Sequence, residues 1–428
     1  DPHLALLGGA FAAVLVLLGP PVLLLGMVSP FAVRIAIGAV GDAGRTAGRI
    51  SALSAAGSIV GTLAPVFLLI PWLGTRRTLL GIGLLLVSLG GAALWAWARR
   101  GRVLTGSLTL LIAGGWVLGG GPIQASANLI YEGESSYNYI RVVQEGEERR
   151  LLLNEGWGIH STYQPGEVLT GHLFDYFLLA PHFAPPTPHR PPDPPLFPPL
   201  GGTVGGGGSP RLCIIGLAGG TIAHQFTAVY GPVPIDGVEL DGQIVEVARR
   251  FFDLNEPNLR VVVQDGRAFL TQSAGTYDVI VVDAYHTPYI PFHLTTHEFF
   301  ARARACLAEG GVLAINVGST GSDRALAEDI ADTLHTVFPS VYLLDGPEDY
   351  NVAIFATVQP TDLDAIKARL ASLQEARLAA VAARALPALS TWQRARAVFT
   401  DDRAPVEQVV HGMVARYALG VIRGETEE

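Results

Sequence analysis

The sequence has few cysteines and few charged residues for its length. Among 428 residues there are two cysteines, Cys213 and Cys306, and charged residues make up 16%. Two distant cysteines exclude a disulfide framework, so we expect both to be core residues. No HExxH or CxxC pattern is present, and we expect no structural metal. A soluble protein of this size carries about a quarter charged residues. The shortage of charge therefore indicates that part of the chain is not an ordinary soluble domain.

The few charges are distributed unevenly along the chain. Residues 1–130 have very few acids and long apolar runs, whereas residues 131–428 have the composition of a soluble protein. The formal net charge of −9 comes mostly from the second part. Nucleic acid is not expected as a partner, because its phosphates attract basic surfaces. Composition therefore divides the chain near residue 130.

Residues 1–123 are predicted to form a transmembrane helical region. Apolar segments that reach the roughly 20 residues needed to cross a bilayer are residues 4–28, 51–73, 78–98 and 103–123. Pro20-Pro21 should kink or break the first segment, because proline removes a backbone donor. The chain begins at Asp1, which leaves open whether further helices precede it. We therefore expect a multi-pass protein of the cell membrane, with the lipid bilayer as a partner.

Residues 131–183 are predicted to form a small β domain. YNYIRVVQEG and ERRLLLNEG alternate apolar and polar residues around a glycine-bearing turn, which predicts a hairpin. Apolar residues at helical spacing follow in LTGHLFDYFLLAP. Residues 184–210 are rich in proline and glycine and are predicted to be a linker, extended in its first half and flexible in its second.

Residues 211–358 alternate strand and helix patterns, and residues 359–428 are predicted to be a C-terminal helical region. The alternation predicts an α/β fold, a Rossmann-like doubly wound sheet of the class I methyltransferase type, preceded by the small β domain and the transmembrane region. Ligands of such sheets bind at the carboxyl ends of the strands. The residues at those ends are therefore the candidates for a functional site.

The strand ends predict a nucleoside ligand. Gly216, Gly219 and Gly220 follow the first strand, and acids close the next three, namely Glu239, Asp265 and Asp283. Glycines allow close backbone approach to a ligand, and an acid closing the second strand can accept both ribose hydroxyls. GLAGGT is not GxGxxG, and no basic residue is placed to bind a pyrophosphate. A ligand without phosphates, such as S-adenosylmethionine or its decarboxylated form, therefore fits better than a dinucleotide.

With these residues in this order, the sequence resembles the spermidine synthase (polyamine aminopropyltransferase) family, in its membrane-fused branch. The motifs that carry the resemblance are ESSYNYIRV (134–142), IIGLAGGT (214–221), VELD (238–241), DGRAFL (265–270), YDVIVVDAY (277–285), LTTHEFF (294–300) and TDDRAPVE (400–407). GMVSPFAVR and GSIVGTLAPVFLLIPWLG are also similar to that branch. The resemblance implies a small β domain ahead of a Rossmann-like domain. It also implies transfer of an aminopropyl group from decarboxylated S-adenosylmethionine to an amine, with no metal.

The resemblance implies roles for single residues. Glu239 would hold the ribose and Asp265 the adenine side, while glycines line the methionine portion. The full set expected to bind the nucleoside is Gly216, Gly219, Gly220, Glu239, Asp265, Gly266 and Asn138. Asp283 matches the acid that accepts a proton from the attacking amine. A carboxylate suits that role, because an amine is a nucleophile only when it is deprotonated.

Several positions depart from the family's pattern. His286, which we place with Asp283 in the catalytic site, stands where the family has a second Asp that binds the amine. Ala218 replaces an Asp in the glycine loop, and further replacements are Asn138 for Gln, Leu173 (beside His172) for Tyr, and His160 for Gln. A polyamine is a chain of positive charges, and two of the acids expected near it are absent. His286 therefore indicates a changed substrate pocket.

Three functions stay open on the sequence alone. The first is a membrane-anchored transferase that uses S-adenosylmethionine or its decarboxylated form and an amine acceptor. The second is a methyltransferase or related transferase acting on a lipid or membrane-bound small molecule. The third is a degenerate scaffold or accessory subunit of a membrane complex, against which the retention of Glu239, Asp265 and Asp283 argues. A homodimer and a membrane-complex partner are both left open.

The arginines do not fix the orientation in the membrane. Arg76 and Arg77 fall on the side of the soluble part, and the arginines on the other side, if every segment spans, are Arg34, Arg45, Arg49, Arg99, Arg100 and Arg102. The positive-inside rule would then place the soluble part outside. The expected nucleoside is cytoplasmic, and a re-entrant segment 103–123 would agree with it. We expect a cytoplasmic soluble domain.

Overall fold

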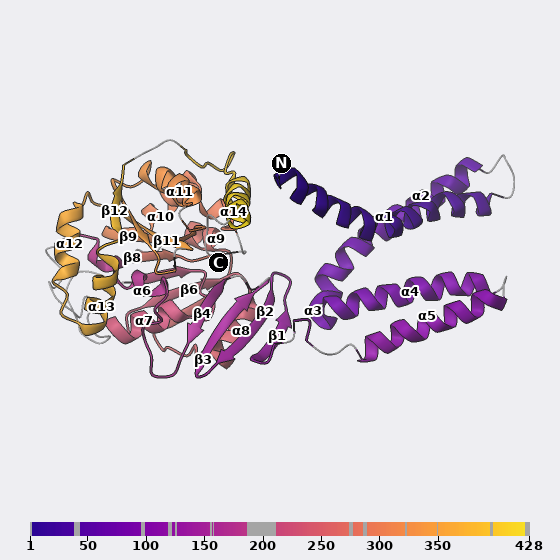
Figure 1. The fold of residues 1–428 in the computed structure, drawn as a ribbon, viewed down its shortest axis with the longest axis horizontal. Helices are drawn as coiled ribbons and strands as arrows, with labels where there is room; N and C mark the ends of the chain where they lie inside the picture. Colours follow the sequence, from indigo (N-terminus) through magenta and orange to yellow (C-terminus); the bar gives the residue numbers. More distant parts are fainter. Residues whose placement is uncertain are drawn as a thin grey trace. The chain divides into compact units, whose positions relative to one another are not determined.

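The computed structural model divides into two units, each described here by itself (Figure 1). One unit is Asp1–Ala125 with Gly133–Tyr137, and the other is Ser126–Glu132 with Asn138–Glu428. The residues that the structure describes are 2–37, 43–95, 99–118, 122–124, 126–154, 156, 158–185, 211–273, 277–285, 289–321, 323–348, 350–393 and 397–423. The predicted linker 184–210 lies outside them, apart from residues 184 and 185.

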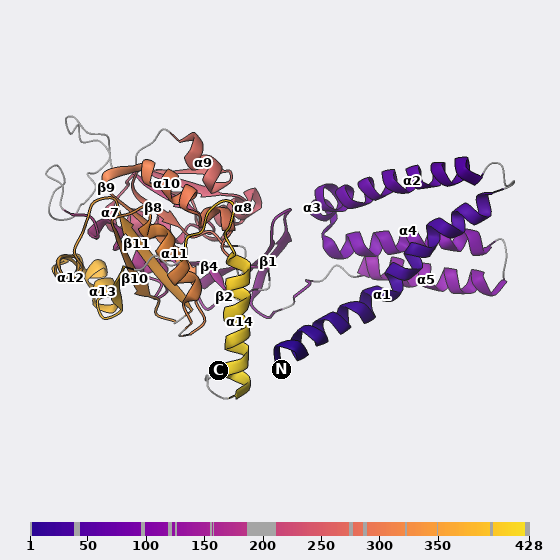
Figure 2. The same ribbon diagram turned by 90° about the horizontal axis from the view of Figure 1, so that it is seen from above.

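The first unit is helical. Its elements are α1 (Pro2–Ala36), α2 (Ala43–Ala64), the π-helical segment η2 (Pro65–Leu69), α3 (Ile70–Leu73), α4 (Thr75–Trp95) and α5 (Arg99–Leu118). The helices α4 and α5 lie side by side (Figures 1 and 2). Helix α1 continues through Pro20-Pro21, so the helix is not interrupted at these prolines. The wider π turn begins at Pro65, where a proline lacks the N–H of a regular helix.

Two stretches of the described helices are long and apolar enough to cross a membrane. They are Phe11–Ala36 and Ala43–Leu73, with mean hydropathies of 2.4 and 2.0. Thr105–Val117 is a shorter apolar helix. Large apolar side chains on the long helices are exposed, as Leu17 and Ile59 illustrate. The two later predicted spans, 78–98 and 103–123, stay predictions.

A four-stranded sheet stands where the small β domain was predicted. Its order is β1 (Leu129–Glu134), β2 (Tyr139–Glu145), β3 (Glu148–Leu153) and β4 (Ile159–Tyr163), and β3 pairs antiparallel with β2 and β4. Its apolar face packs against one helix of the next domain, in a cluster of Ile140, Val142, Leu151, Leu153, Ile244, Val247 and Phe252. The short helices α6 (Phe174–Phe177) and η3 (Ala180–His182) follow the sheet.

The larger sheet has the order β12-β10-β11-β9-β8-β5-β6-β7. Its strands are β5 (Leu212–Ile215), β6 (Ile235–Glu239), β7 (Leu259–Val263), β8 (Tyr277–Val282), β9 (Leu307–Gly318), β10 (Ser340–Asp345), β11 (Asn351–Thr357) and β12 (Leu389–Trp392). Strands β5 to β9 pair in parallel, whereas β11 is antiparallel to both β9 and β10. The C-terminal region 359–428, predicted to be helical, also supplies β12, which pairs antiparallel with β10 at the edge. Four residues are too few to show a strand period in the sequence.

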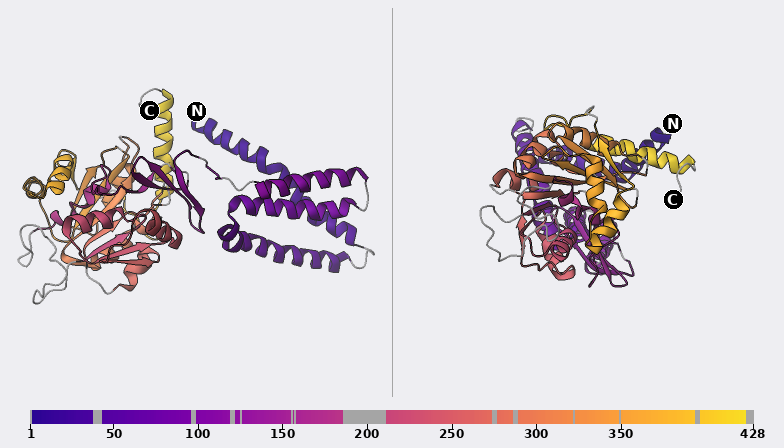
Figure 3. Two further views of the ribbon diagram at one scale, coloured as in Figure 1. Left: turned by 90° about the horizontal axis from the view of Figure 1, so that it is seen from below. Right: turned by 90° about the vertical axis from the view of Figure 1, so that its left-hand side faces the viewer.

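Helices cover both faces of this sheet (Figures 1 and 3). They are α7 (Thr221–Tyr230), α8 (Gly242–Phe251), α9 (Gly266–Gln272), α10 (His297–Ala305), α11 (Ala325–His335), α12 (Leu363–Ala371), α13 (Ala376–Ala385) and α14 (Val406–Arg423), with the 3-10 turn η4 (Phe292–Leu294). Because strand side chains alternate, Leu212 and Ile214 of β5 join one core with α7, α12 and α13. Cys213 and Ile215 join the other core, with α9, α10, α11 and α14. The prediction of a doubly wound, class I methyltransferase-like fold is confirmed, and Cys213 and Cys306 are both buried.

Candidate active site

The carboxyl ends of β5 and β8 form the topological switch point of the sheet, where the strand order turns in opposite directions. Gly216 follows β5 with a φ of +89°, and a Cβ there would lie 2.6 Å from the carbonyl carbon of Asp283 and 2.9 Å from Cα of Ala284. The backbone N–H of Asp283 donates to the carbonyl of Ile215 at 2.8 Å. Only glycine fits this approach, and the approach fixes the backbone of Asp283 at the switch point.

The carboxylate of Asp283 lines a cavity of about 480 Å³. Nδ2 of Asn316 donates to Oδ1 of Asp283 at 2.9 Å, and Nδ2 of Asn351 donates to Oδ1 of Asn316 at 2.9 Å. The second bond fixes the Asn316 amide so that its NH₂ faces the carboxylate. Burial raises the pKa of Asp283 to about 6, against the smaller lowering effect of the Asn316 hydrogen bond. Asp283 is thus largely ionised at neutral pH and still basic enough to accept a proton.

Two further titratable groups of the cavity, His160 and Tyr285, are neutral near pH 7. Burial lowers the pKa of His160 to about 4, so its imidazole is neutral near pH 7. Burial and the neighbouring Asp283 raise the pKa of Tyr285 well above its usual value, so the phenol keeps its proton. Oε1 of Glu348 lies 2.6 Å from Nδ1 of His172. Among the described lining residues, Asp283 and Glu348 are the carboxylates.

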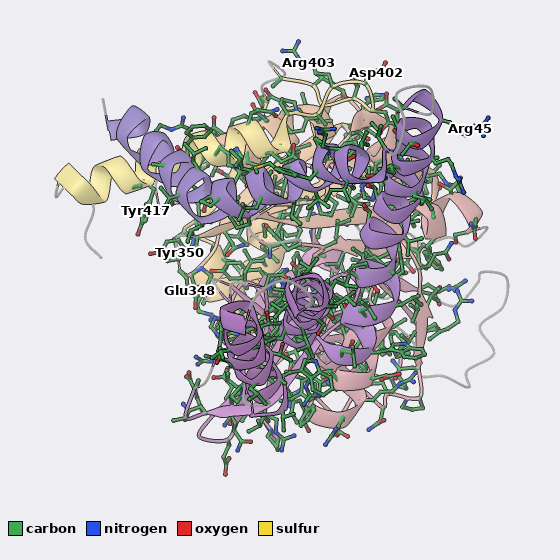
Figure 4. The ribbon with its side chains drawn as sticks, turned by 90° about the vertical axis from the view of Figure 1, so that its right-hand side faces the viewer. Arg45, Glu348, Tyr350, Asp402, Arg403 and Tyr417 are labelled. Carbon is green, nitrogen blue, oxygen red and sulfur yellow. The ribbon has the colours of Figure 1, made fainter. Side chains whose placement is uncertain are left out.

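Helix α14 supplies one wall of the cavity through Val410, Met413, Val414 and Tyr417. Figure 4 shows Tyr417 near Tyr350 and Glu348, which come from the β10–β11 connection and line the same cavity. Apolar side chains of the lining are Val410, Met413 and Val414 of α14, Leu326 of α11 and residues 159, 173 and 174. The cavity therefore combines a half-buried carboxylate with a group of apolar side chains.

Polar contacts hold α14 against the domain. Both terminal guanidinium nitrogens of Arg267 donate to the carboxylate of Asp401, just ahead of the helix. On α14 itself, Nε of Arg416 lies 2.6 Å from Oδ2 of Asp323. These pairs and the buried side chains of α14 keep its wall in a defined place.

Glu239, expected at the ribose, is buried at the end of β6. Its Oε2 accepts the N–H of Ala218 at 2.9 Å and its Oε1 accepts the N–H of Asp241 at 3.0 Å. Burial raises the pKa of Glu239, although these backbone hydrogen bonds oppose the rise. A carboxylate has further lone pairs, so the ribose role stays a prediction.

Asp265, expected at the adenine side, caps α9. Its Oδ1 accepts the N–H of Ala268 at 2.8 Å, and its Oδ2 lies 2.9 Å from Nε2 of His293. Burial would raise the pKa of Asp265, but the Ala268 and His293 hydrogen bonds outweigh it and lower the pKa. The His293 contact was not predicted, because nothing in the spacing of these residues indicates it.

The conformation or close packing of the fold explains the other glycines that were expected at the ligand. The N–H of Gly219 donates to Oγ of Ser161 at 2.8 Å, and a Cβ on Gly219 would lie 2.6 Å from Cβ of Ser161. Gly220 is the N-cap of α7 with a φ of +89°. A Cβ on Gly266 would overlap the side chain of Ile215. Their contact with a nucleoside stays a prediction.

Asn138 reaches this region through a hydrogen-bond chain. Its Nδ2 donates to Oδ2 of Asp241 at 3.0 Å, and its Oδ1 accepts Nδ2 of Asn154 at 3.2 Å. Asp241 in turn donates its N–H to Glu239. His286 lies outside the described residues, so its role as a changed pocket residue stays a prediction.

Several cavity residues were missed by the sequence analysis. Tyr285 stands inside a quoted motif but received no role, and Asn316 lies within β9 rather than at a strand end. Asn351 opens β11, whose pairing with β9 brings it next to Asn316. A polar residue inside an otherwise apolar strand, as in LAINV, was the available signal for Asn316.

Comparison with known proteins finds similarity to a family model over residues that include most of this sheet. Residues 204–355 match the model of the spermine/spermidine synthase domain. A probable polyamine aminopropyl transferase of Bifidobacterium longum is 34% identical over 233 residues, 54% of this chain and 47% of that protein. A polyamine aminopropyltransferase of Mycobacterium tuberculosis is 26% identical over 306 residues, 65% of this chain and 52% of that protein. The chain spans about half the length of these curated relatives.

Among solved structures, spermidine synthase from Thermotoga maritima is 19% identical to this chain, and the match covers 60% of this chain and 84% of that chain with a TM-score of 0.45. The match of residues 204–355 to the family model confirms the resemblance read from the sequence for that domain. The membrane-fused branch stays a prediction.

Proposed function

We propose that this protein transfers an aminopropyl group from decarboxylated S-adenosylmethionine to an amine, with Asp283 as the proton acceptor. The observation that carries the proposal is the place of Asp283. It is a half-buried carboxylate with a pKa raised to about 6, and it lines a cavity at the switch point of a domain that matches the spermine/spermidine synthase model. The relatives are named aminopropyl transferases, and the aminopropyl group of the proposal is taken from those names.

The reaction is a displacement at carbon. The amine nitrogen attacks the aminopropyl carbon attached to the sulfonium, the C–S bond breaks, and methylthioadenosine leaves with the electron pair. The new C–N bond forms as a proton passes from the nitrogen to the Asp283 carboxylate. Asn316 orients that carboxylate through its hydrogen bond. The apolar lining limits water, which would compete as a hydrogen-bond partner.

The nucleoside is proposed to lie across Gly216–Gly220, with Glu239 at its ribose. Calorimetry with S-adenosylmethionine, its decarboxylated form and methylthioadenosine tests this placement. We expect the full-length protein to bind at least one of them and Glu239→Gln to weaken that binding. A folded protein that binds none of the three would contradict the placement.

The pH dependence of turnover should report Asp283. With a pKa of about 6, kcat at saturating amine should fall about tenfold per pH unit below pH 6, because the protonated acid cannot accept a proton. Above pH 7, where Asp283 is ionised, kcat should no longer rise with pH because of this group. The measurement is the initial rate of methylthioadenosine release between pH 4.5 and 8. A profile that is flat through pH 6 would show that another group controls the rate.

We also propose that the helical unit anchors the protein in a bilayer. Phe11–Ala36 and Ala43–Leu73 support this by length and hydropathy. We expect the full chain to stay in the membrane fraction after alkaline carbonate washing, while a chain beginning at Ser126 is recovered without detergent. Release of the full chain by carbonate would contradict the anchor.

A further inference from the structure

We infer that the acceptor is a primary amine with a single positive charge and an apolar chain, and that α14 selects it. This inference rests on the proposed function, since it names the substrate class of the same cavity. It concerns the wall that helix α14 supplies to the cavity lined by Asp283.

The charge of the cavity suits one ammonium group. Asp283 is a half-buried acid, and among the described residues its carboxylate contacts the amide of Asn316 rather than a cation. Glu348 is about half exposed and already bonded to His172. An exposed pair of this kind contributes little to binding, because water screens it. His160, which also lines the cavity, is neutral near pH 7 and offers no negative charge.

The α14 wall suits an apolar chain. Val410 and Met413 are buried in the core beneath the cavity, and Val414 lies at its more exposed side. A second ammonium group placed against these side chains would lose its hydration without gaining a partner, which is costly. A methyl group in the same place would be favoured by burial.

The selectivity can be measured with two amines of equal length, hexylamine and 1,6-diaminohexane. We expect the full-length protein to favour hexylamine by at least about tenfold in kcat/KM for methylthioadenosine release. Calorimetry of both amines, in the presence of methylthioadenosine, gives the same comparison without turnover. Release with neither amine would count against the proposed transfer reaction, whereas the binding preference tests the inference by itself.

A charge on the wall should change the preference. Val414→Glu places a carboxylate on the lining of the cavity and should raise the diamine-to-monoamine ratio about fivefold. Gln408→Glu adds the same charge on an exposed position of α14 that does not line the cavity, and should leave the ratio unchanged. Glu348→Gln should change the ratio less than twofold.

The inference is overturned if wild-type protein binds the diamine as well as or better than hexylamine, or if it binds neither amine. It is also overturned if Gln408→Glu shifts the ratio as much as Val414→Glu, since the effect would then be long-range charge. A large loss of diamine binding in Glu348→Gln would show that Glu348 holds a second ammonium group.

Discussion

Replacing Asp283 by Asn is expected to lower turnover by about 10²–10⁴-fold while nucleoside binding survives. The amide keeps the shape of the carboxylate and can still accept the hydrogen bond from Asn316, but it cannot accept the amine proton. The factor is the usual contribution of a positioned base. The measurement is the rate of methylthioadenosine release, with calorimetry of methylthioadenosine as the check on binding. Asp402→Asn, at an exposed position outside the cavity (Figure 4), is the matched control and should keep the wild-type rate.

The same variant should be more stable than wild type at pH 8. The pKa of Asp283 is raised from 3.8 to about 6 in the folded protein, so ionisation disfavours folding once the pH passes 3.8 and does so fully above 6. This corresponds to an effect on the order of 3 kcal/mol. We therefore expect the stability advantage of Asp283→Asn over wild type to be larger at pH 8 than at pH 4. An inactive variant that is destabilised at pH 8 would show that the carboxylate has a structural role.

Replacing Gly216 by Ala is expected to destabilise the soluble unit by roughly 3 kcal/mol or more. A positive φ costs an alanine about 1–2 kcal/mol, and the overlap with the backbone of Asp283 adds the cost of overpacking, about 1–3 kcal/mol. The overlapping atoms are backbone, so no side-chain rotation relieves them. The measurement is the unfolding midpoint of the full-length protein in detergent. Activity should fall as well, because the displaced backbone carries the base.

Gly146→Ala is the control for this substitution. Gly146 also has a positive φ, of +64°, but a Cβ there meets no atom within 4 Å. It should cost only the conformational part, about 1–2 kcal/mol. Equal losses in the two variants would show that the loop after β5 adjusts and that the close approach to Asp283 is not required.

The strands and helices could be predicted from the sequence because each one has a pattern of apolar and polar residues within its own short segment. Strand β8 is a run of apolar residues that ends at a carboxylate, and Asp283 was accordingly identified as the end of a buried strand. The strand order is not local, so the place of Asp283 beside Gly216 could only be expected from the general rule for parallel sheets. The antiparallel β11 and the edge strand β12 followed from no pattern in the sequence.

The cavity was less predictable than the strand ends. Asn316 and Asn351 meet because β9 and β11 pair, and their separation in the chain hides the contact. Met413 and Val414 belong to a helix whose own sequence shows an apolar face but not which surface it covers. The resemblance supplied the proposed base and the residues predicted to bind the nucleoside, whereas the α14 wall of the cavity followed only from the packing of this helix.

The most direct test of the central claim is mass spectrometry of the nucleoside product when full-length protein is incubated with hexylamine and an equimolar mixture of S-adenosylmethionine and its decarboxylated form. The account predicts methylthioadenosine, matched mole for mole by aminopropylated hexylamine. S-adenosylhomocysteine in place of methylthioadenosine would contradict it and indicate methyl transfer instead.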